Sequence, residues 1–273
     1  MVDGRAWARI LALARKDAEE VRHQPGLVLP ALAMGAGLTL PAFIVMVIAP
    51  RLTGEALADS DFAEAAEAAI GLAPALAAYS LEGRAQAFVL QQFLLFALLA
   101  PVLGSLSLAA QAIIGEKQSR ALEPLLATPI RTGELLLAKV LTPFLISMGL
   151  LLATFLLYLG GTALWAEPGV WRTLFWTRTL VLYGVMGPLV SLTALMMAAI
   201  ISSRVNDART AQQLGGFLVL PLMALFVTQL LGQFLLGTPA LLAMAGLLAL
   251  SDVLLVGLGI RIFQRETILM RWK

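Results

Sequence analysis

Long stretches without a charged residue constrain this chain more than any other feature of its sequence. Residues 85–114, 140–166 and 210–251 contain no Asp, Glu, Lys or Arg. An uncharged apolar stretch of 18 or more residues is typical of a transmembrane helix. Over the whole sequence, 60% of the residues are hydrophobic and 13% are charged, whereas soluble proteins carry about 25% charged residues. The chain is therefore predicted to be an all-α integral membrane protein.

The apolar stretches divide into six predicted spans. A helix needs roughly 20 residues to cross the hydrocarbon core of a bilayer. The last uncharged stretch is too long for one crossing, and the sequence Gly-Thr-Pro at residues 237–239 marks a reversal inside it. The predicted spans cover residues 27–49, 86–114, 140–164, 179–202, 214–236 and 240–260, within a single transmembrane domain of residues 1–273.

The distribution of Lys and Arg predicts which side of the membrane each segment faces. All but four of the 19 Lys and Arg residues fall in the N-terminal segment, in the segments after the second and fourth spans, or in the C-terminal tail. The other four are Arg51, Arg84, Arg172 and Arg178. Cytosolic loops carry an excess of basic residues, so both termini and residues 115–139 are predicted to be cytosolic.

The N-terminal segment, residues 5–24, is predicted to form an amphipathic helix. Six apolar residues recur at helical spacing, whereas Arg9, Lys16, Asp17 and Glu20 fall elsewhere on the helix. A helix of this kind lies in the plane of the lipid headgroups. Two interpretations stay open: a generic membrane anchor, or a lever that joins the cytosolic side to the first span. The six apolar residues are Trp7, Ile10, Leu11, Ala14, Ala18 and Val21.

The segment between the second and third spans, residues 115–139, is rich in charge and longer than a tight turn. Within it, residues 119–127 are predicted to form a short helix. Leu122, Leu125 and Leu126 then share one face of that helix, at the spacing i, i+3, i+4. An apolar face at a membrane surface must pack against something.

Two occupants are possible for that face. It could lie on lipid headgroups or on the protein's own spans, or it could bind a cytosolic partner.

The short helix is predicted to end at Thr128, because a residue that precedes a proline, here Pro129, is disfavoured in the α conformation. A second helix is predicted to begin near Thr132 and to continue into the third span.

The same segment resembles the signature of ABC-2 type transporter permeases. That pattern has an E-(K/R) pair, then G-T-L-E-x-L-L-x-T-P, then G-K at the entry to the third span. This sequence departs from it at Arg120 and Ala121, where Gly and Thr are usual, and at Ala138, where Gly is usual. The six spans and the N-terminal helix match as well, so the resemblance covers nearly the whole chain. The matching residues are Glu116, Lys117, Leu122, Glu123, Pro124, Leu125, Leu126, Ala127, Thr128, Pro129, Glu134, Leu135 and Lys139.

The resemblance implies a permease subunit of an ATP-driven exporter in the bacterial cytoplasmic membrane. In that family the segment after the second span forms a coupling helix, which docks into a separate cytosolic ATPase subunit that binds ATP and Mg²⁺. Two permeases, identical or paralogous, are expected to pair and form the export path. The sequence contains no G-x-x-x-x-G-K-[ST] motif, so no cofactor is expected in this chain. The residues expected to couple are Glu116, Lys117, Leu122, Glu123, Leu125, Leu126, Thr128 and Pro129.

Polar residues inside the predicted spans form a possible intramembrane site. An ionisable residue within a span is costly and usually faces the bundle interior or water. Asp252 is interpreted either as a contact for a cation or substrate, or as a buried hydrogen-bonding group. The glutamines could line a path or join helices by hydrogen bonds. The candidate residues are Asp252, Gln91, Gln92, Gln229 and Gln233.

Two other functions compete with ATP-driven export. A secondary transporter driven by an ion gradient would use Asp252 as its proton or sodium site. A membrane enzyme acting on lipid would need a nucleophile–base pair or a metal site, but the sequence has no cysteine and a single histidine, His23, so no catalytic or metal-binding residue is expected. A net charge of +2 does not indicate nucleic-acid binding. The expected partners are membrane lipid, an ATPase subunit and a second permease.

Overall fold

The computed structural model describes residues 4–23, 25–71, 73–118, 132–205, 207–231 and 235–262. These residues form helices and no strands. Six helical segments are long and apolar enough to cross a membrane, which confirms the predicted all-α membrane fold. They are Leu29–Thr53, Leu81–Gln111, Leu136–Trp165, Thr177–Arg204, Arg209–Leu231 and Thr238–Ile262, and they are called spans 1 to 6 below.

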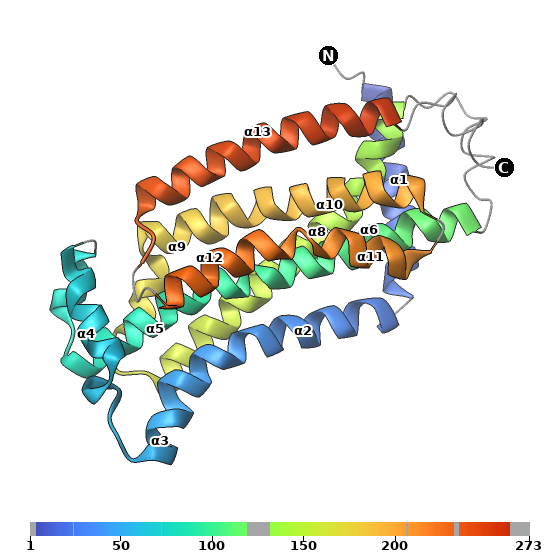
Figure 1. Ribbon diagram of the computed structural model, residues 1–273. Coiled ribbons are helices and arrows are strands. Elements are labelled where there is room, and N and C mark those ends of the chain that lie inside the picture. Colours follow the sequence, from blue (N-terminus) through green and yellow to red (C-terminus); the bar gives the residue numbers. More distant parts are fainter. Residues whose placement is uncertain are drawn as a thin grey trace.

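The spans are built from several helices, which Figure 1 shows side by side in one bundle. Span 2 is the central one, since 83% of its most apolar window is buried inside the molecule, compared with 17% for span 6. The α-helices are α1 (Gly4–Arg22), α2 (Pro25–Phe43), α3 (Ala49–Thr53), α4 (Asp61–Ala68), α5 (Leu81–Ala97), α6 (Leu99–Gln118), α8 (Thr132–Trp165), α9 (Thr177–Val181), α10 (Gly187–Arg204), α11 (Ala208–Gly216), α12 (Val219–Leu231) and α13 (Thr238–Ile262).

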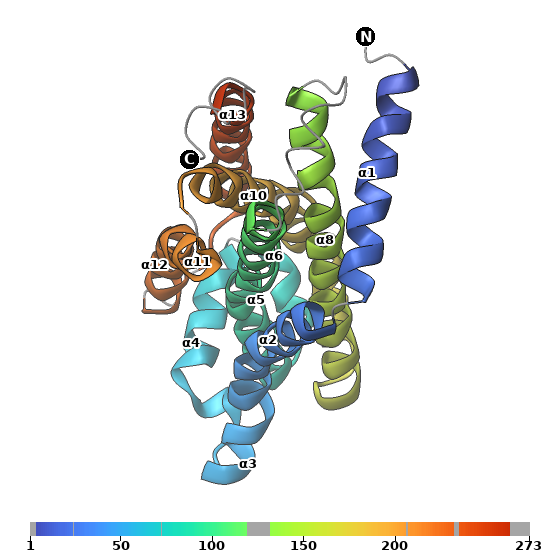
Figure 2. The same ribbon diagram turned by 90° about the vertical axis from the view of Figure 1, so that its right-hand side faces the viewer.

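The bundle has two distinct ends. One end, called the α1 end, contains α1, the end of α6, the start of α8 and the end of α13 (Figure 1), and there α1 packs against α8. At the other, called the α4 end, lie α4 and α9. Seen along the bundle from the α1 end, α6 is surrounded by α2, α8, α10 and α11, and α1 runs crosswise beside α8 (Figure 2). The fold therefore places α1 and the start of α8, which leads into span 3, on the same side of the bundle.

Prolines interrupt two spans with wider helical turns. A π-helical turn at Ile44–Ile48 in span 1 is followed by Pro50, and one at Leu182–Met186 in span 4 is followed by Pro188. A proline inside a helix clashes with the carbonyl four residues before it and cannot donate to that carbonyl. A single wider turn ahead of the proline accommodates the clash without ending the span.

Prolines break two other spans more sharply. In span 2, α5 ends at Ala97 and α6 starts at Leu99, two residues before Pro101. In span 5, α11 ends at Gly216 and α12 begins at Val219, two residues before Pro221. The residues between the helices form tight turns in which each N–H bonds to a carbonyl three residues back. Spans 2 and 5 are thus each composed of two helices joined at a proline-induced break.

Some observed boundaries differ from the predicted ones. Span 2 begins five residues earlier than residue 86, and α8 begins at Thr132, where the sequence predicts the helix that enters span 3. The prediction that the fifth span reaches residue 236 is wrong: α12 stops at Leu231, and residues 235–237 are not helical. There the N–H of Leu236 bonds to the side-chain Oε1 of Gln229 at 3.2 Å instead of to a helical carbonyl.

Candidate functional site

The predicted coupling residues lie at the α1 end, between α6 and α8. Glu116 and Lys117 belong to the last turn of α6. The remaining six, Leu122, Glu123, Leu125, Leu126, Thr128 and Pro129, lie outside the described residues, as does the predicted short helix. The structure therefore fixes the two helices that flank the segment, which enter and leave the same end of the bundle (Figure 2).

Two ion pairs join α1 to the first turns of α8. Lys139 Nζ donates to both carboxylate oxygens of Asp17 at 3.0 Å, and both side chains are almost completely buried. One helical turn before Lys139, Glu134 accepts two hydrogen bonds from Arg9, at 2.8 and 3.1 Å. A bidentate Arg–carboxylate pair fixes orientation as well as distance. The first part of α8 and α1 are consequently held as one unit.

The apolar face of α1 is divided between two environments. Ala6, Ile10 and Ala14 are buried, and the carbonyl of Ala14 accepts a hydrogen bond from Thr142 of α8 at 2.9 Å. Trp7 and Leu11 are about half exposed. The single apolar stripe predicted from the sequence therefore serves partly as a protein contact, while Trp7, Leu11 and Ala18 remain exposed to another environment.

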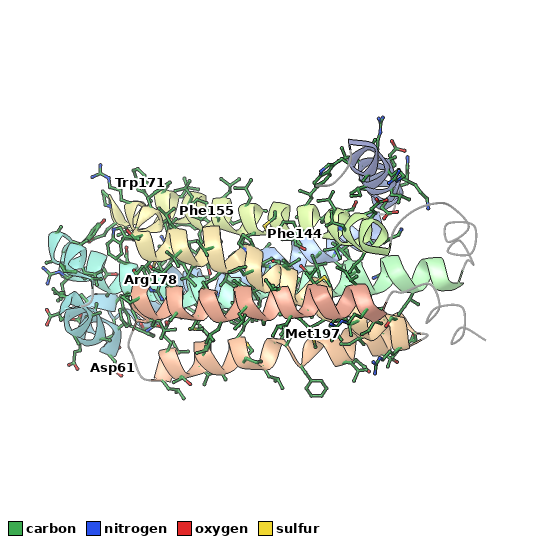
Figure 3. All side chains as sticks on the ribbon, turned by 90° about the horizontal axis from the view of Figure 1, so that it is seen from above. Asp61, Phe144, Phe155, Trp171, Arg178 and Met197 are labelled. Atoms are coloured by element: carbon green, nitrogen blue, oxygen red, sulfur yellow. The ribbon has the colours of Figure 1, made fainter. Side chains whose placement is uncertain are left out.

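A buried polar cluster occupies the α4 end of the bundle. Gln91 of α5, Gln229 of α12 and Arg178 of α9 meet there (Figure 3 labels Arg178). Arg178 Nη1 donates to Oε1 of Gln91 at 2.6 Å and to its backbone carbonyl at 2.9 Å, while Nη2 donates to Oε1 of Gln229 at 3.3 Å. The Nε atom donates to the carbonyl of Leu236 at 3.0 Å. Four segments of the chain are joined through one guanidinium group.

The glutamine side chains extend the same network. Gln91 Nε2 donates to Thr179 Oγ1 and to the carbonyl of Thr173, both at 2.9 Å. Gln92 and Gln229 donate to each other's backbone carbonyls at 3.4 Å. All three glutamines are fully buried. The structure therefore brings three of the predicted polar residues together as helix-joining groups, while Gln233 lies outside the described residues.

Arg178 is a buried residue that no sequence pattern singles out as part of a site. It is one of the four basic residues outside the predicted cytosolic segments, and it lies in the first turn of span 4, where it is 8% exposed. Among the residues that the structure describes, no carboxylate pairs with it. Removing a charge from water costs several kcal/mol, and here neutral carbonyl and amide oxygens offset that cost. The available signal was its position, as the last charge before the uncharged run of residues 179–203.

Asp252 lies apart from this cluster. It is on α13 and is buried against α10, where its Oδ1 accepts a hydrogen bond from Thr193 at 2.6 Å. Its Oδ2 is buried and has no partner within the described residues. Among the described residues of the whole chain, no group of three or more His, Asp or Glu side chains could hold a metal ion. The five predicted intramembrane residues therefore do not form one site.

Asp207, just before span 5, caps α11 at the α1 end. Its Oδ2 accepts hydrogen bonds from the backbone N–H and the hydroxyl of Thr210, both at 2.9 Å. These bonds favour the ionised form and lower the pKa of the Asp207 carboxyl. The cap satisfies backbone donors that would otherwise be unpaired at the start of the helix.

A bundle of six apolar spans, each long enough to cross a bilayer, defines an integral membrane protein. A family model described as ABC-2 family transporter protein matches residues 11–256, so the chain belongs to the ABC-2 transporter family. It is thus an ABC transporter permease, a transmembrane rather than a nucleotide-binding subunit. The comparison with curated proteins found no match.

Proposed function

We propose that this permease forms an export path as a dimer and is driven by a separate cytosolic ATPase subunit. The observation that carries the proposal is the ABC-2 family match over residues 11–256, together with the charged segment that this match encloses between α6 and α8. ATP hydrolysis is assigned to a partner because residues 1–273 contain no phosphate-cradling G-x-x-x-x-G-K-[ST] motif.

The docking element for that ATPase is the segment of residues 115–139. Its ends belong to α6 and α8, and both reach the α1 end of the bundle. Leu125 and Leu126 supply the apolar contact, and Glu116, Lys117 and Glu123 supply charge around it. The excess of basic residues in this segment and in α1 supports a cytosolic position for the α1 end.

The ion pairs between α1 and α8 give the docking segment a rigid connection to the membrane. Displacement of the segment moves α8, and α1 follows because Asp17 and Glu134 are each held by two hydrogen bonds. The exposed edge formed by Trp7 and Leu11 then lies in the headgroup region of the inner leaflet. The helix α2, which leads into span 1, begins three residues after α1 ends, so span 1 receives the same motion.

The export path is assigned to the region where spans 2 and 5 meet between two permeases. In related permeases these spans lie nearest the dimer axis. Here α12 of span 5 packs on α5 of span 2, and the most apolar part of span 5 is only 22% buried within the chain. A second copy would cover part of that open surface. The proline-induced breaks in both spans allow their halves to reorient separately.

Substituting Leu125 by Asp tests the docking element. We expect the Leu125→Asp protein to insert and purify normally but to bind its ATPase at least about a hundredfold more weakly, because a buried unpaired charge costs several kcal/mol. Co-purification of the ATPase with the tagged permease, quantified against wild type, measures the loss.

Leu52→Asp is the matched control. Leu52 is 81% exposed in α3, near the α4 end of the bundle, so the same chemical change there should leave ATPase binding intact. If Leu125→Asp and Leu126→Asp both bind the ATPase as wild type does, residues 119–131 are not the docking element.

A further inference from the structure

Arg178 connects segments that the proposed export path would have to separate. Its guanidinium bonds to α5 through Gln91, to α12 through Gln229, and to the connection between α12 and α13 through the carbonyl of Leu236. Gln229 also accepts a hydrogen bond from the N–H of Leu236, so that connection is held twice. The α4 ends of spans 2, 4 and 5 are closed around this one side chain.

The chemistry of these partners is unusual for a buried charge. Among the described residues, every acceptor of Arg178 is a neutral carbonyl or amide oxygen. A carboxylate at the same distance would attract the guanidinium far more strongly, because Coulomb attraction is large where water is excluded. Neutral acceptors give a contact that is specific in geometry, since Arg presents its donors in a rigid planar fork, but that opens more readily than an ion pair.

We propose that Arg178 is a releasable latch that keeps the α4 ends of spans 2, 4 and 5 closed. This inference rests on the proposed function, because an export path that starts at a cytosolic α1 end has its exit at the α4 end. Release requires Gln229 and the carbonyl of Leu236 to leave the guanidinium, which leaves the two 3.4 Å hydrogen bonds between Gln92 and Gln229 as the remaining polar contacts between α5 and α12 among the described residues. The latch belongs to the state that the structure describes, with the glutamines fully buried.

A single reporter cysteine tests the latch in a chain that has no cysteine of its own. Leu235 is 3% exposed and precedes the tethered Leu236, so Leu235→Cys should react slowly with a hydrophilic maleimide in the purified, detergent-solubilised protein. We expect Arg178→Gln to raise the labelling rate about tenfold or more, because hydrogen bonds to a charged donor are lost. Arg178→Lys should give an intermediate rate, since it keeps the charge but not the fork.

Gln229→Glu should have the opposite effect on the labelling rate, because it strengthens a contact of Arg178 instead of removing one. It places a carboxylate of the same shape beside Arg178 and gives up only the 3.4 Å hydrogen bond to Gln92. Labelling of the reporter should become at least about threefold slower than in the parent, as expected for an added charge-assisted bond. If Arg178→Gln does not accelerate labelling, or Gln229→Glu does not slow it, the latch is wrong.

Two controls separate local opening from general unfolding. Arg172→Gln removes an exposed arginine near the same end, one that contacts Trp171, and should leave the labelling rate unchanged. A cysteine at Leu57, which is 4% exposed and makes no hydrogen bond to Arg178, should stay slow in every variant. Equal acceleration at residues 57 and 235 would mean loss of fold and would overturn the assignment of a latch.

The complex with the ATPase distinguishes this inference from the proposed function. During ATP hydrolysis, labelling of Leu235→Cys should rise in the parent and stay low in Gln229→Glu, an effect that a merely structural role of Arg178 would not produce. A rise of equal size in both would overturn the latch. If ATP changes neither protein while the detergent results hold, the ATPase-driven function is wrong and the latch stands.

Discussion

Buried polar side chains in this protein differ in whether they keep a hydrogen-bond partner after a neighbouring residue is substituted. Asp252 has one described partner, the hydroxyl of Thr193, and that hydroxyl also lies 3.0 Å from the carbonyl of Leu189 in its own helix. The Thr193 hydroxyl therefore keeps an acceptor when Asp252 is removed. Asp252, in contrast, has no alternative donor among the described residues when Thr193 is removed.

This asymmetry predicts unequal effects of the two substitutions. Thr193→Val should destabilise the protein by about 1–3 kcal/mol, because it leaves a buried carboxyl without a donor. Asp252→Leu should change stability by less than about 1 kcal/mol, and it should cancel most of the loss when combined with Thr193→Val. Thermal unfolding of the purified proteins in detergent measures the four combinations.

Ser251→Ala, a neighbouring change that removes only a bond within α13, serves as the control and should stay close to wild type. A larger loss for Asp252→Leu than for Thr193→Val would contradict the asymmetry. An Asp252→Asn protein with unchanged melting but no transport would instead support an ion site at this carboxyl.

At the scale of elements, the contact between α1 and α8 depends on paired charges set into an apolar surface. Asp17 and Lys139 are almost fully buried, and Ile10 and Ala14 of α1 are buried as well. A buried ion pair adds little net stability over apolar residues, but removing one partner leaves an uncompensated charge. The pair therefore fixes which turns of the two helices face each other.

Exchanging the two charges tests that role. Asp17→Lys and Lys139→Asp should each lower stability by about 3–5 kcal/mol, because each places two like charges in a buried contact. The double exchange should recover at least half of that loss, measured as the melting temperature in detergent.

The exposed pair of Arg15 and Glu19 provides the comparison within the same helix. It is an i, i+4 pair with both side chains largely in solvent, so Glu19→Gln should shift stability by less than about 0.5 kcal/mol. Failure of the double exchange to recover any stability would show that apolar packing alone holds α1 on α8.

At the scale of the whole molecule, the two ends of the bundle differ in what they carry. The α1 end carries α1, the end of α6 and the start of α8, whereas the α4 end carries α4 and the Arg178 cluster (Figures 1 and 3). The central span 2 connects them. The proposed function requires the α1 end to be cytosolic.

Labelling of intact cells tests that orientation. Glu55→Cys introduces an exposed thiol between α3 and α4, and Arg15→Cys introduces one on α1. A membrane-impermeant maleimide should modify residue 55 in intact cells and residue 15 only after the membrane is permeabilised, because an excess of basic residues predicts a cytosolic position for the α1 end. The reverse pattern would invert the orientation and exclude cytosolic docking at the α1 end.

The sequence by itself determined the features that depend on local composition. Six apolar runs define six spans, because every backbone polar group in lipid must be satisfied within a helix. Prolines at 50, 101, 188 and 221 could be located in the sequence, and each lies beside an irregular turn or break. The family signature was also readable, since its residues lie within one short stretch, residues 116–139.

Only the tertiary structure decided which polar groups meet. Asp17 and Lys139 are 122 positions apart, and Arg178 and Gln91 are 87 apart, so no local pattern pairs them. The sequence equally allowed Gln91, Gln92 and Gln229 to line a path or to join helices, and it grouped Asp252 with them. In the folded protein the glutamines join helices around Arg178, and Asp252 lies apart from them on α13. The reason is that a buried polar group is stable only where the fold supplies its hydrogen-bond partner.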